Sequence, residues 1–148
     1  MTKPLIVAGA IALMSALPAA ADLMQIPSHK PVAETMDALQ AAVEGAGATV
    51  FARVDHGAGA RKAELELGAS QLLIFGNPKL GTPAMQADMR AGLYLPLRVL
   101  AYEDAEGQVW LTYEDPAEML SALDIPADAG FIAKMQGALG KLTAAAAQ

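Results

Sequence analysis

The sequence predicts an α+β fold in which a single mixed or antiparallel sheet of about four to five strands has helices packed on one face. Two kinds of apolar spacing support this prediction. A period of about 3.6 residues is typical of amphipathic helices, and a period of two is typical of strands. The chain has 148 residues, and no internal repeat or low-complexity linker divides it. We therefore expect one domain over residues 22–148.

The first 21 residues have the pattern of a secretory signal peptide. Lys3 gives a positive start, residues 5–17 are apolar apart from Ser15, and the small residues up to Ala21 resemble a signal-peptidase site. The apolar segment is too short for a stable membrane span. We expect cleavage after Ala21 and a periplasmic or secreted protein.

Composition excludes several classes of function. The chain has no cysteine, which rules out disulfides, thiol catalysis and cysteine-ligated metal. Without Lys3, nine basic residues stand against 16 acidic ones, a formal charge of −7 for residues 22–148. An acidic chain without a Lys/Arg cluster is a poor match for nucleic acid or for an anionic membrane surface.

The segment after the leader predicts an edge strand followed by a helix. The segment 22–26 is short and only partly apolar, which is typical of an edge strand. Pro31 suits the first position of a helix, and apolar residues then recur at steps of three and four from Val32 to Val43. Gly45 follows, and glycine is typical of a helix end.

Residues 49–56 alternate in polarity with a period of two and are predicted as a strand. A short helix over residues 60–67 is expected next, with its charged side chains in solvent. The alternation places Val50, Ala52, Val54 and His56 on the more apolar face of the strand, and Phe51, Arg53 and Asp55 on the other.

The apolar run 72–75 is bounded by helix and strand breakers, a pattern typical of a fully buried strand. Residues 76–83 are predicted as a stiff polar loop, because glycine and proline interrupt regular structure there. A brief helix over residues 84–89 and a linker over 93–96 follow. Polar loops at strand ends often carry binding residues, although such a loop also simply turns the chain.

Residues 97–103 and 109–113 are predicted to form a β-hairpin, and Gly107 in its turn suits a left-handed backbone. Tyr102 and Trp110 fall on the side of these strands opposite their apolar faces. This aromatic side is expected to contact either a second subunit or a helix of the same chain.

Two helices are predicted near the C-terminus. Asp115 followed by Pro116 combines a capping residue with a proline at the first helical position. Apolar residues at helical spacing predict a last helix over residues 130–143. The alanine-rich residues 144–147 are expected to fray.

Several ordered segments together resemble the bacterial and archaeal domain of unknown function 302 family over about residues 34–123. The resemblance implies a compact α+β fold that pairs as a homodimer, and it brings no activity. Glu114 stands before Asp115 and Pro116 where relatives often have asparagine. The segments that carry the resemblance are residues 49–56, 72–83, 95–98, 103–104 and 109–116.

The candidate ligand-binding residues are Asp55, His56, Asn77, Lys79 and Thr82. In a parallel or mixed sheet, strand ends gather at one edge, so His56 is expected to meet the loop that carries Asn77 and Lys79. An imidazole, an amide and a cation together would orient a small polar or anionic ligand. In the purely structural alternative, His56 binds a backbone carbonyl and Asn77 braces a turn.

We expect a non-catalytic homodimer that binds a small ligand, with a low-activity hydrolase or isomerase as the alternative. His56 is the candidate catalytic residue of that alternative. The serines lie outside any nucleophile-elbow pattern, and no Gly-rich phosphate motif is present. His56 and Asp55 point to opposite faces if both lie in a strand.

A copper- or haem-related protein is a further alternative. Met85 and Met89 lie one helical turn apart, and thioethers with an imidazole such as His56 suit Cu(I). The other methionines of residues 22–148 lie at apolar positions, where methionine is ordinary core filler. No haem-attachment motif is present, so we assign no metal ligands and no cofactor.

Overall fold

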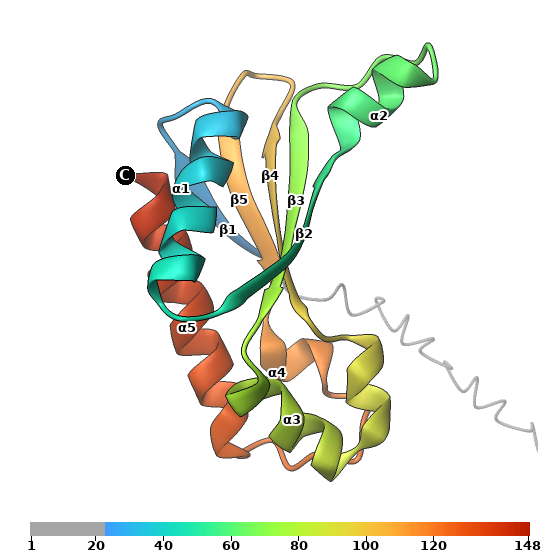
Figure 1. The fold of residues 1–148 in the computed structure, drawn as a ribbon, viewed down its shortest axis with the longest axis vertical. Coiled ribbons are helices and arrows are strands. Elements are labelled where there is room, and N and C mark those ends of the chain that lie inside the picture. The colour runs from blue at the N-terminus through green and yellow to red at the C-terminus, as the bar shows by residue number, and fades with distance from the viewer. Residues whose placement is uncertain (1–22) are drawn as a thin grey trace, which may run out of the picture.

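Five antiparallel strands form one sheet in the order β1-β5-β4-β3-β2 (Figure 1). The computed structural model describes residues 23–148, so the predicted leader over residues 1–21 lies outside the described residues. The strands are β1 (Leu23–Ser28), β2 (Thr49–Asp55), β3 (Ser70–Gly76), β4 (Leu97–Glu103) and β5 (Val109–Glu114). The helices are α1 (Val32–Gly45), α2 (His56–Lys62), α3 (Pro78–Ala87), the 3₁₀ helix η1 (Met89–Leu93), α4 (Pro116–Met119) and α5 (Gly130–Ala147). The predicted α+β fold is confirmed.

Alternate residues of the central strands point into the core. Leu73 and Phe75 of β3 are buried, whereas Leu72 and Ile74 are only half-buried. The prediction of a fully buried strand at residues 72–75 is therefore wrong, since one face of β3 has no helix against it among the described residues. β4 follows the same alternation, and β5 follows it except at Thr112, which is buried on the other face.

α1 and α5 cover the buried face of the sheet side by side (Figure 1). Met36 and Leu39 of α1 and Met135 and Leu139 of α5 are almost fully buried between them and the strands. The prediction of a helix ending near Gly45 is confirmed. Burial of large apolar side chains, roughly 1.5–3 kcal/mol each, drives this layer packing.

α5 extends through the segment that was expected to fray. It ends at Ala147, and both Ala146 and Ala147 are buried. The Nζ of Lys30 donates a hydrogen bond to the carbonyl oxygen of Ala146, 3.4 Å away. The burial of these alanines and the hydrogen bond from the loop between β1 and α1 hold the last turn of α5 in place.

A β-bulge between Val50 and Ala52 changes the predicted faces of β2. Val50 is opposite Phe75 and Arg53 is opposite Leu73, so both face the helices. Arg53 pairs there with Asp37 of α1. The predicted common face of Val50, Ala52, Val54 and His56 is thus wrong, because one extra residue inverts the alternation.

α2 begins at His56, earlier than the predicted helix over residues 60–67, and ends at Lys62. His56 is therefore a helical residue rather than the end of a strand. Figure 1 shows α2 and the turn after it projecting away from the body of the molecule. Leu65 and Leu67 in that segment are 65% and 54% exposed.

Residues 76–83, predicted as a loop, mostly belong to a helix. α3 begins at Pro78 and continues through Gly81 and Pro83 to Ala87. Asn77 caps it and Pro78 occupies the first helical turn, which proline tolerates. The predicted hairpin and the start of α4 at Pro116 are confirmed.

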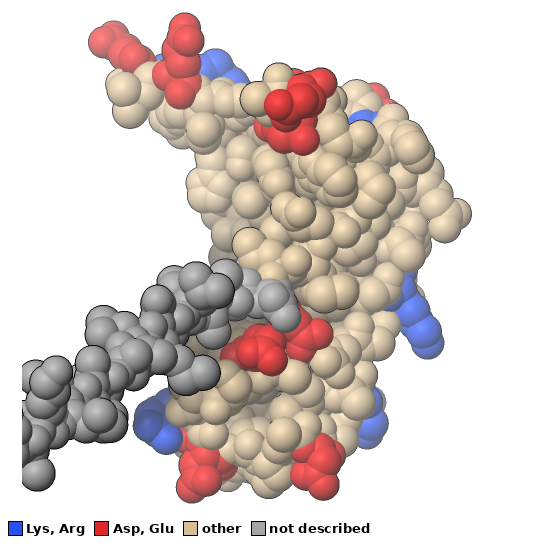
Figure 2. Space-filling view, turned by 180° about the vertical axis from the view of Figure 1, so that it is seen from behind, with Lys and Arg blue, Asp and Glu red and all other residues tan. Residues whose placement is uncertain are grey.

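The face of the sheet opposite α1 and α5 carries no helix among residues 23–148. In Figure 1 it lies between α2 above and α3 with η1 below, and Figure 2 shows a hollow on this side between these parts. We call it the open face. Register places on it Leu23, Gln25, Ala52, Val54, Leu72, Ile74, Arg98, Leu100, Tyr102, Trp110, Thr112 and Glu114.

Thr112 on the open face provides a test of the packing. Its hydroxyl is buried and has no hydrogen-bond partner among the described residues. Thr112→Val should therefore raise the free energy of unfolding by roughly 1 kcal/mol, measured by urea denaturation. Thr35→Val is the matched control: the Thr35 hydroxyl lies 2.7 Å from that of Ser28, so its loss should destabilise by about 1–2 kcal/mol. Equal losses in both variants would contradict this account of Thr112.

Candidate functional site

Antiparallel pairing separates the predicted site residues into two groups. Asp55 at the end of β2 is opposite Gln71 at the start of β3, whereas Gly76 at the end of β3 is opposite Thr49. The two ends of this seven-residue pairing lie roughly 20 Å apart. Asp55 and His56 thus lie at one end of the sheet, and Asn77, Lys79 and Thr82 lie at the other. The structure does not bring His56 and Asn77 together.

At the first end, Asp55 has a structural role. Its Oδ1 accepts a hydrogen bond from the backbone N–H of Ala58 at 2.7 Å, which caps α2. Its Oδ2 accepts from the Nε2 of Gln71 at 3.2 Å, and the Oε1 of Gln71 accepts from the Nε of Arg53. His56 beside it is exposed and makes no side-chain hydrogen bond to any described residue.

A cavity of about 270 Å³ lies at this first end, and Asp55 is part of its wall. Arg61 and Glu103 bring opposite charges to its wall, and neither side chain forms an ion pair within residues 23–148. Both side chains are exposed, so water solvates them well. His56 is not part of the wall.

At the other end of the sheet, Asn77 connects β3 to α3. Its Oδ1 accepts a hydrogen bond from the backbone N–H of Lys79 at 2.9 Å. Lys79 itself is exposed, and Thr82 lies one turn further along α3. The predicted structural role of Asn77 as a brace is therefore real, with a helix in place of the predicted loop.

A largely apolar cavity of about 260 Å³ lies between this end of the sheet, α3, η1 and α5. Of the predicted residues, Asn77 and Thr82 line it, and they are its polar side chains. None of the lining side chains is charged. The apolar side chains of the wall are Phe51, Pro78, Leu80, Met85, Leu95, Pro96, Leu97 and Met135.

Three glycines leave room for this cavity. Gly76, Gly81 and Gly92 all line it, and none has a side chain to fill it. A Cβ atom on Gly81 would lie 3.7 Å from the Cδ1 of Leu95, an ordinary contact distance. A Cβ atom on Gly92 would lie 3.3 Å from the sulfur of Met85, which is tighter. A methyl group is therefore accommodated at Gly81 but reduces the cavity.

Phe51 forms the mouth of the cavity. It lies in the β-bulge of β2 and is 58% exposed, although it contributes to the cavity wall. A Cβ atom on Gly76 would lie 3.5 Å from its ring and 3.4 Å from Pro96. The ring is thus placed over the end of β3, where it shields one side of the cavity from water.

Asp88 fixes η1, which forms another wall. Its side chain is 8% exposed and accepts hydrogen bonds from the backbone N–H groups of Arg90 and Asp124. The guanidinium of Arg90 donates to the same carboxylate through Nε and Nη2. These hydrogen bonds, those from the Arg90 side chain above all, hold the pKa of Asp88 well below its ordinary value.

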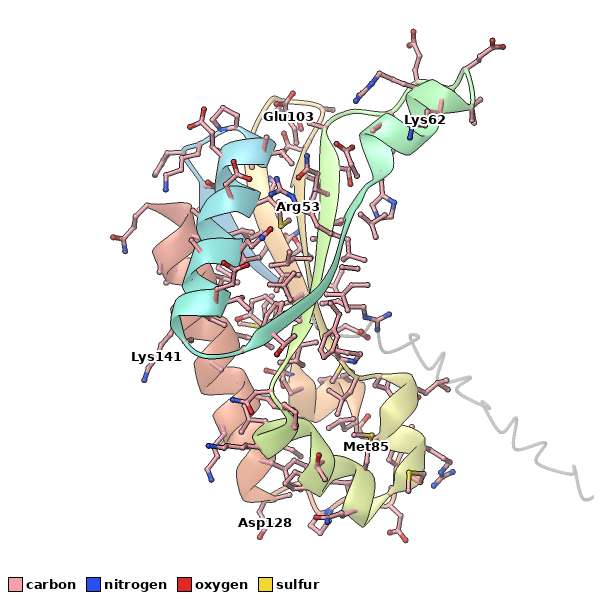
Figure 3. All side chains as sticks on the ribbon, in the orientation of Figure 1. Arg53, Lys62, Met85, Glu103, Asp128 and Lys141 are labelled. Atoms are coloured by element: carbon pink, nitrogen blue, oxygen red, sulfur yellow. The ribbon has the colours of Figure 1, made fainter. Side chains whose placement is uncertain are left out.

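The arrangement considered for copper does not form. Met85 lines the apolar cavity, but Met89 is 78% exposed on η1, and His56 is at the other end of the sheet. Figure 3 shows Met85 among the lower helices, at the opposite end of the molecule from Glu103. Within residues 23–148, no group of three or more His, Asp or Glu side chains is placed to hold a metal ion.

Sequence reasoning missed most of the cavity. The alternation of polarity does not show the bulge at Phe51, so it predicts the wrong faces for the residues that follow, among them Arg53 and Val54. The glycines were interpreted as loop breakers, whereas Gly81 is a helical residue. One signal was available: glycine inside a helix that also contains proline lowers helix propensity and often has a packing reason.

Comparison with known proteins identifies relatives of this chain. A family model described as "Domain of unknown function DUF302" matches residues 24–147. A crystal structure of an uncharacterized conserved protein DUF302 from Bacillus stearothermophilus has a TM-score of 0.76 at 15% identity, and the alignment covers 85% of this chain and 98% of that one. At this identity the likeness concerns the fold.

Two curated relatives carry a more specific name. They are fluoride-specific ion channel FluC 1 of Brucella suis biovar 1 and of Brucella abortus biovar 1. Each is 50% identical over 95 residues, which are 64% of this chain but 37% and 35% of those proteins. This chain therefore spans little more than a third of their length. No helix among residues 23–148 is long and apolar enough to cross a membrane.

Acid titration tests the role of Asp88. Because its pKa is lowered in the folded state, its contribution to stability is complete above the unfolded pKa of about 3.9 and is lost as the pH falls toward the folded pKa. The difference in unfolding free energy between the wild type and Asp88→Ala should thus be constant above about pH 5 and shrink below about pH 4.

Denaturant unfolding at about pH 7 and about pH 3 measures this difference. Asp128→Ala is the control, since Asp128 is exposed and makes no side-chain hydrogen bond to a described residue. An Asp88→Ala difference of the same size at both pH values would contradict the assignment.

Proposed function

Since the chain belongs to the domain of unknown function 302 family, we propose its function from the cavity rather than from the family's name. We propose an exported, non-catalytic binding protein that pairs as a homodimer and holds a small ligand between β3, α3, η1 and α5. The signal-peptide pattern of residues 1–21 supports export. The proposal of ligand binding rests on the apolar cavity of about 260 Å³.

The cavity has the properties of a small-molecule site. Its volume of about 260 Å³ exceeds the roughly 150 Å³ of an engineered apolar cavity that binds benzene. An apolar wall with a few polar groups that fix orientation is typical of ligand pockets. Here those polar groups come from Asn77 and Thr82. Two of the five candidate binding residues thus lie where the proposal needs them.

The open face supports the homodimer. It exposes Val54 and Leu23 by 38% and 56%. Arg98 and Glu114 form an ion pair with each other on it at 3.8 Å, so these charges are balanced within one chain. A face with exposed apolar side chains and little net charge can pack against its own copy about a two-fold axis. We therefore propose a second copy of this chain as its occupant.

The enzyme alternative with His56 has less support. His56 is exposed, has no hydrogen-bonded orienting group among residues 23–148, and lies at the end of the sheet away from the apolar cavity. A hydrolase or isomerase that used it would work on the surface, where water competes for every contact. The copper- or haem-related alternative is similarly weak, since no histidine lines the apolar cavity.

The name of the Brucella relatives supports a second candidate, an accessory role beside a fluoride channel. A sequence 50% identical to 95 residues of this chain is part of those proteins. Fluoride binding in the apolar cavity is not favoured, because a bare anion would lose its hydration there without a positive charge. A strain that lacks this protein should then grow less well in fluoride than its parent strain. Equal growth of the two strains would refute this candidate function.

Gly81→Ala tests ligand binding without weakening the fold. The added methyl group enters the cavity and should lower the affinity for naphthalene by about fourfold, the equivalent of ~0.8 kcal/mol for one CH₂ group. Alanine for glycine in a helix should raise stability by about 0.5–1 kcal/mol. Calorimetric titration and urea denaturation measure the two effects.

Gly137→Ala is the matched control for this variant. Gly137 lies in α5, and its Cβ atom would contact nothing within 4 Å. It should gain similar stability and keep the naphthalene affinity of the wild type. Unchanged affinity in Gly81→Ala, or no binding by the wild type, would refute the proposed site.

Val54→Glu tests the homodimer. Val54 lies on the open face in the edge strand β2, and a carboxylate there would be buried without a partner in the dimer, which is strongly unfavourable. Sedimentation velocity should show a dimer for the wild type and a monomer for Val54→Glu. Ala41→Glu, on the exposed side of α1, should remain dimeric. A dimer in all three proteins would place the contact elsewhere.

A further inference from the structure

The hydrogen bonding of Asn77 points to the chemistry of the ligand, and this inference rests on the function proposed above. The Oδ1 of Asn77 accepts the backbone N–H of Lys79 at 2.9 Å, as the cap of α3 requires. This bond fixes the orientation of the amide, since an NH₂ group cannot accept from an N–H. The Nδ2 group then has no partner among residues 23–148. At Asn77 the cavity therefore offers an unpaired donor.

The rest of the cavity wall disfavours a charged ligand. No lining side chain is ionised, and every wall other than Asn77 and Thr82 is apolar or glycine. An ionised ligand would lose its hydration there without a counter-charge. The formal charge of −7 for residues 22–148 disfavours anions further. The ligand that fits is neutral.

We propose that the cavity takes a neutral, largely apolar molecule with one hydrogen-bond acceptor, such as the carbonyl of a ketone, ester or amide. The carbonyl oxygen accepts from the Nδ2 of Asn77, and the apolar body packs against Met85, Leu95 and Met135. Phe51 covers the body at the mouth. This ligand class replaces the polar or anionic ligand that the sequence predicts for these residues.

Two probes separate the apolar body from the acceptor. Naphthalene and 2-acetylnaphthalene share the same rings, and the second adds a carbonyl. The wild-type protein should bind 2-acetylnaphthalene roughly 2- to 12-fold more tightly than naphthalene, the range expected for one neutral hydrogen bond. Calorimetric titration of the full mature chain measures both affinities.

Asn77→Asp tests the donor without removing the cap. Aspartate is as good an N-cap as asparagine, so α3 keeps its start, but the atom at the Nδ2 position becomes an oxygen that cannot donate when ionised. The preference for the ketone should disappear. Thr82→Val is the control for the other polar side chain, and it should keep the preference of the wild type.

The outcomes distinguish this inference from the function on which it rests. Equal wild-type affinities for the two probes would overturn the ligand class while leaving the cavity as a binding site. A preference that persists in Asn77→Asp, or one lost in Thr82→Val, would overturn the role of Asn77. If neither probe binds the wild type, the proposed binding function itself fails.

Discussion

The burial of one face of a five-stranded antiparallel sheet under α1 and α5 is the constraint on which the rest of this structure depends. The central strands β3, β4 and β5 direct their buried apolar side chains to that face. The two helices pack Met36, Leu39, Met135 and Leu139 against them. Because the helices occupy one side, the opposite side stays open. The elements that do not fit this layer, α3 and η1, pack below the sheet and enclose the apolar cavity with α5.

Local patterns in the sequence correctly predicted helix α1, the β4–β5 hairpin and the start of α4. The apolar spacing from Val32 to Val43 marked α1, and the strand pattern on either side of Gly107 marked the hairpin, whose turn has the left-handed backbone expected there. Asp115 and Pro116 marked the start of α4. These features depend on residues close together in the chain, so their physical causes are visible in a short window of sequence.

The candidate site was predicted only in part, because its geometry depends on pairing between distant segments. Asn77 and Thr82 were found since they follow an apolar run, but their convergence with His56 required a strand order that no local pattern fixes. The bulge beside Phe51 moved one residue and thereby exchanged the two faces of β2. Packing also overrode propensity in α3, which accommodates Gly81 and Pro83 and so keeps space for a cavity.

The position of β1 in the sheet determines the order in which the fold is completed. β1 is the first strand along the chain, yet its neighbour is β5, so Leu23 pairs with Glu114. This contact closes a loop that contains most of the domain, and contacts of such long sequence separation form slowly. The β2, β3 and β4 segments can meet earlier, through shorter connections. During synthesis from the N-terminus, β1 therefore stays unpaired until β5 has been made. β1 is the first strand along the chain and the last to join the sheet.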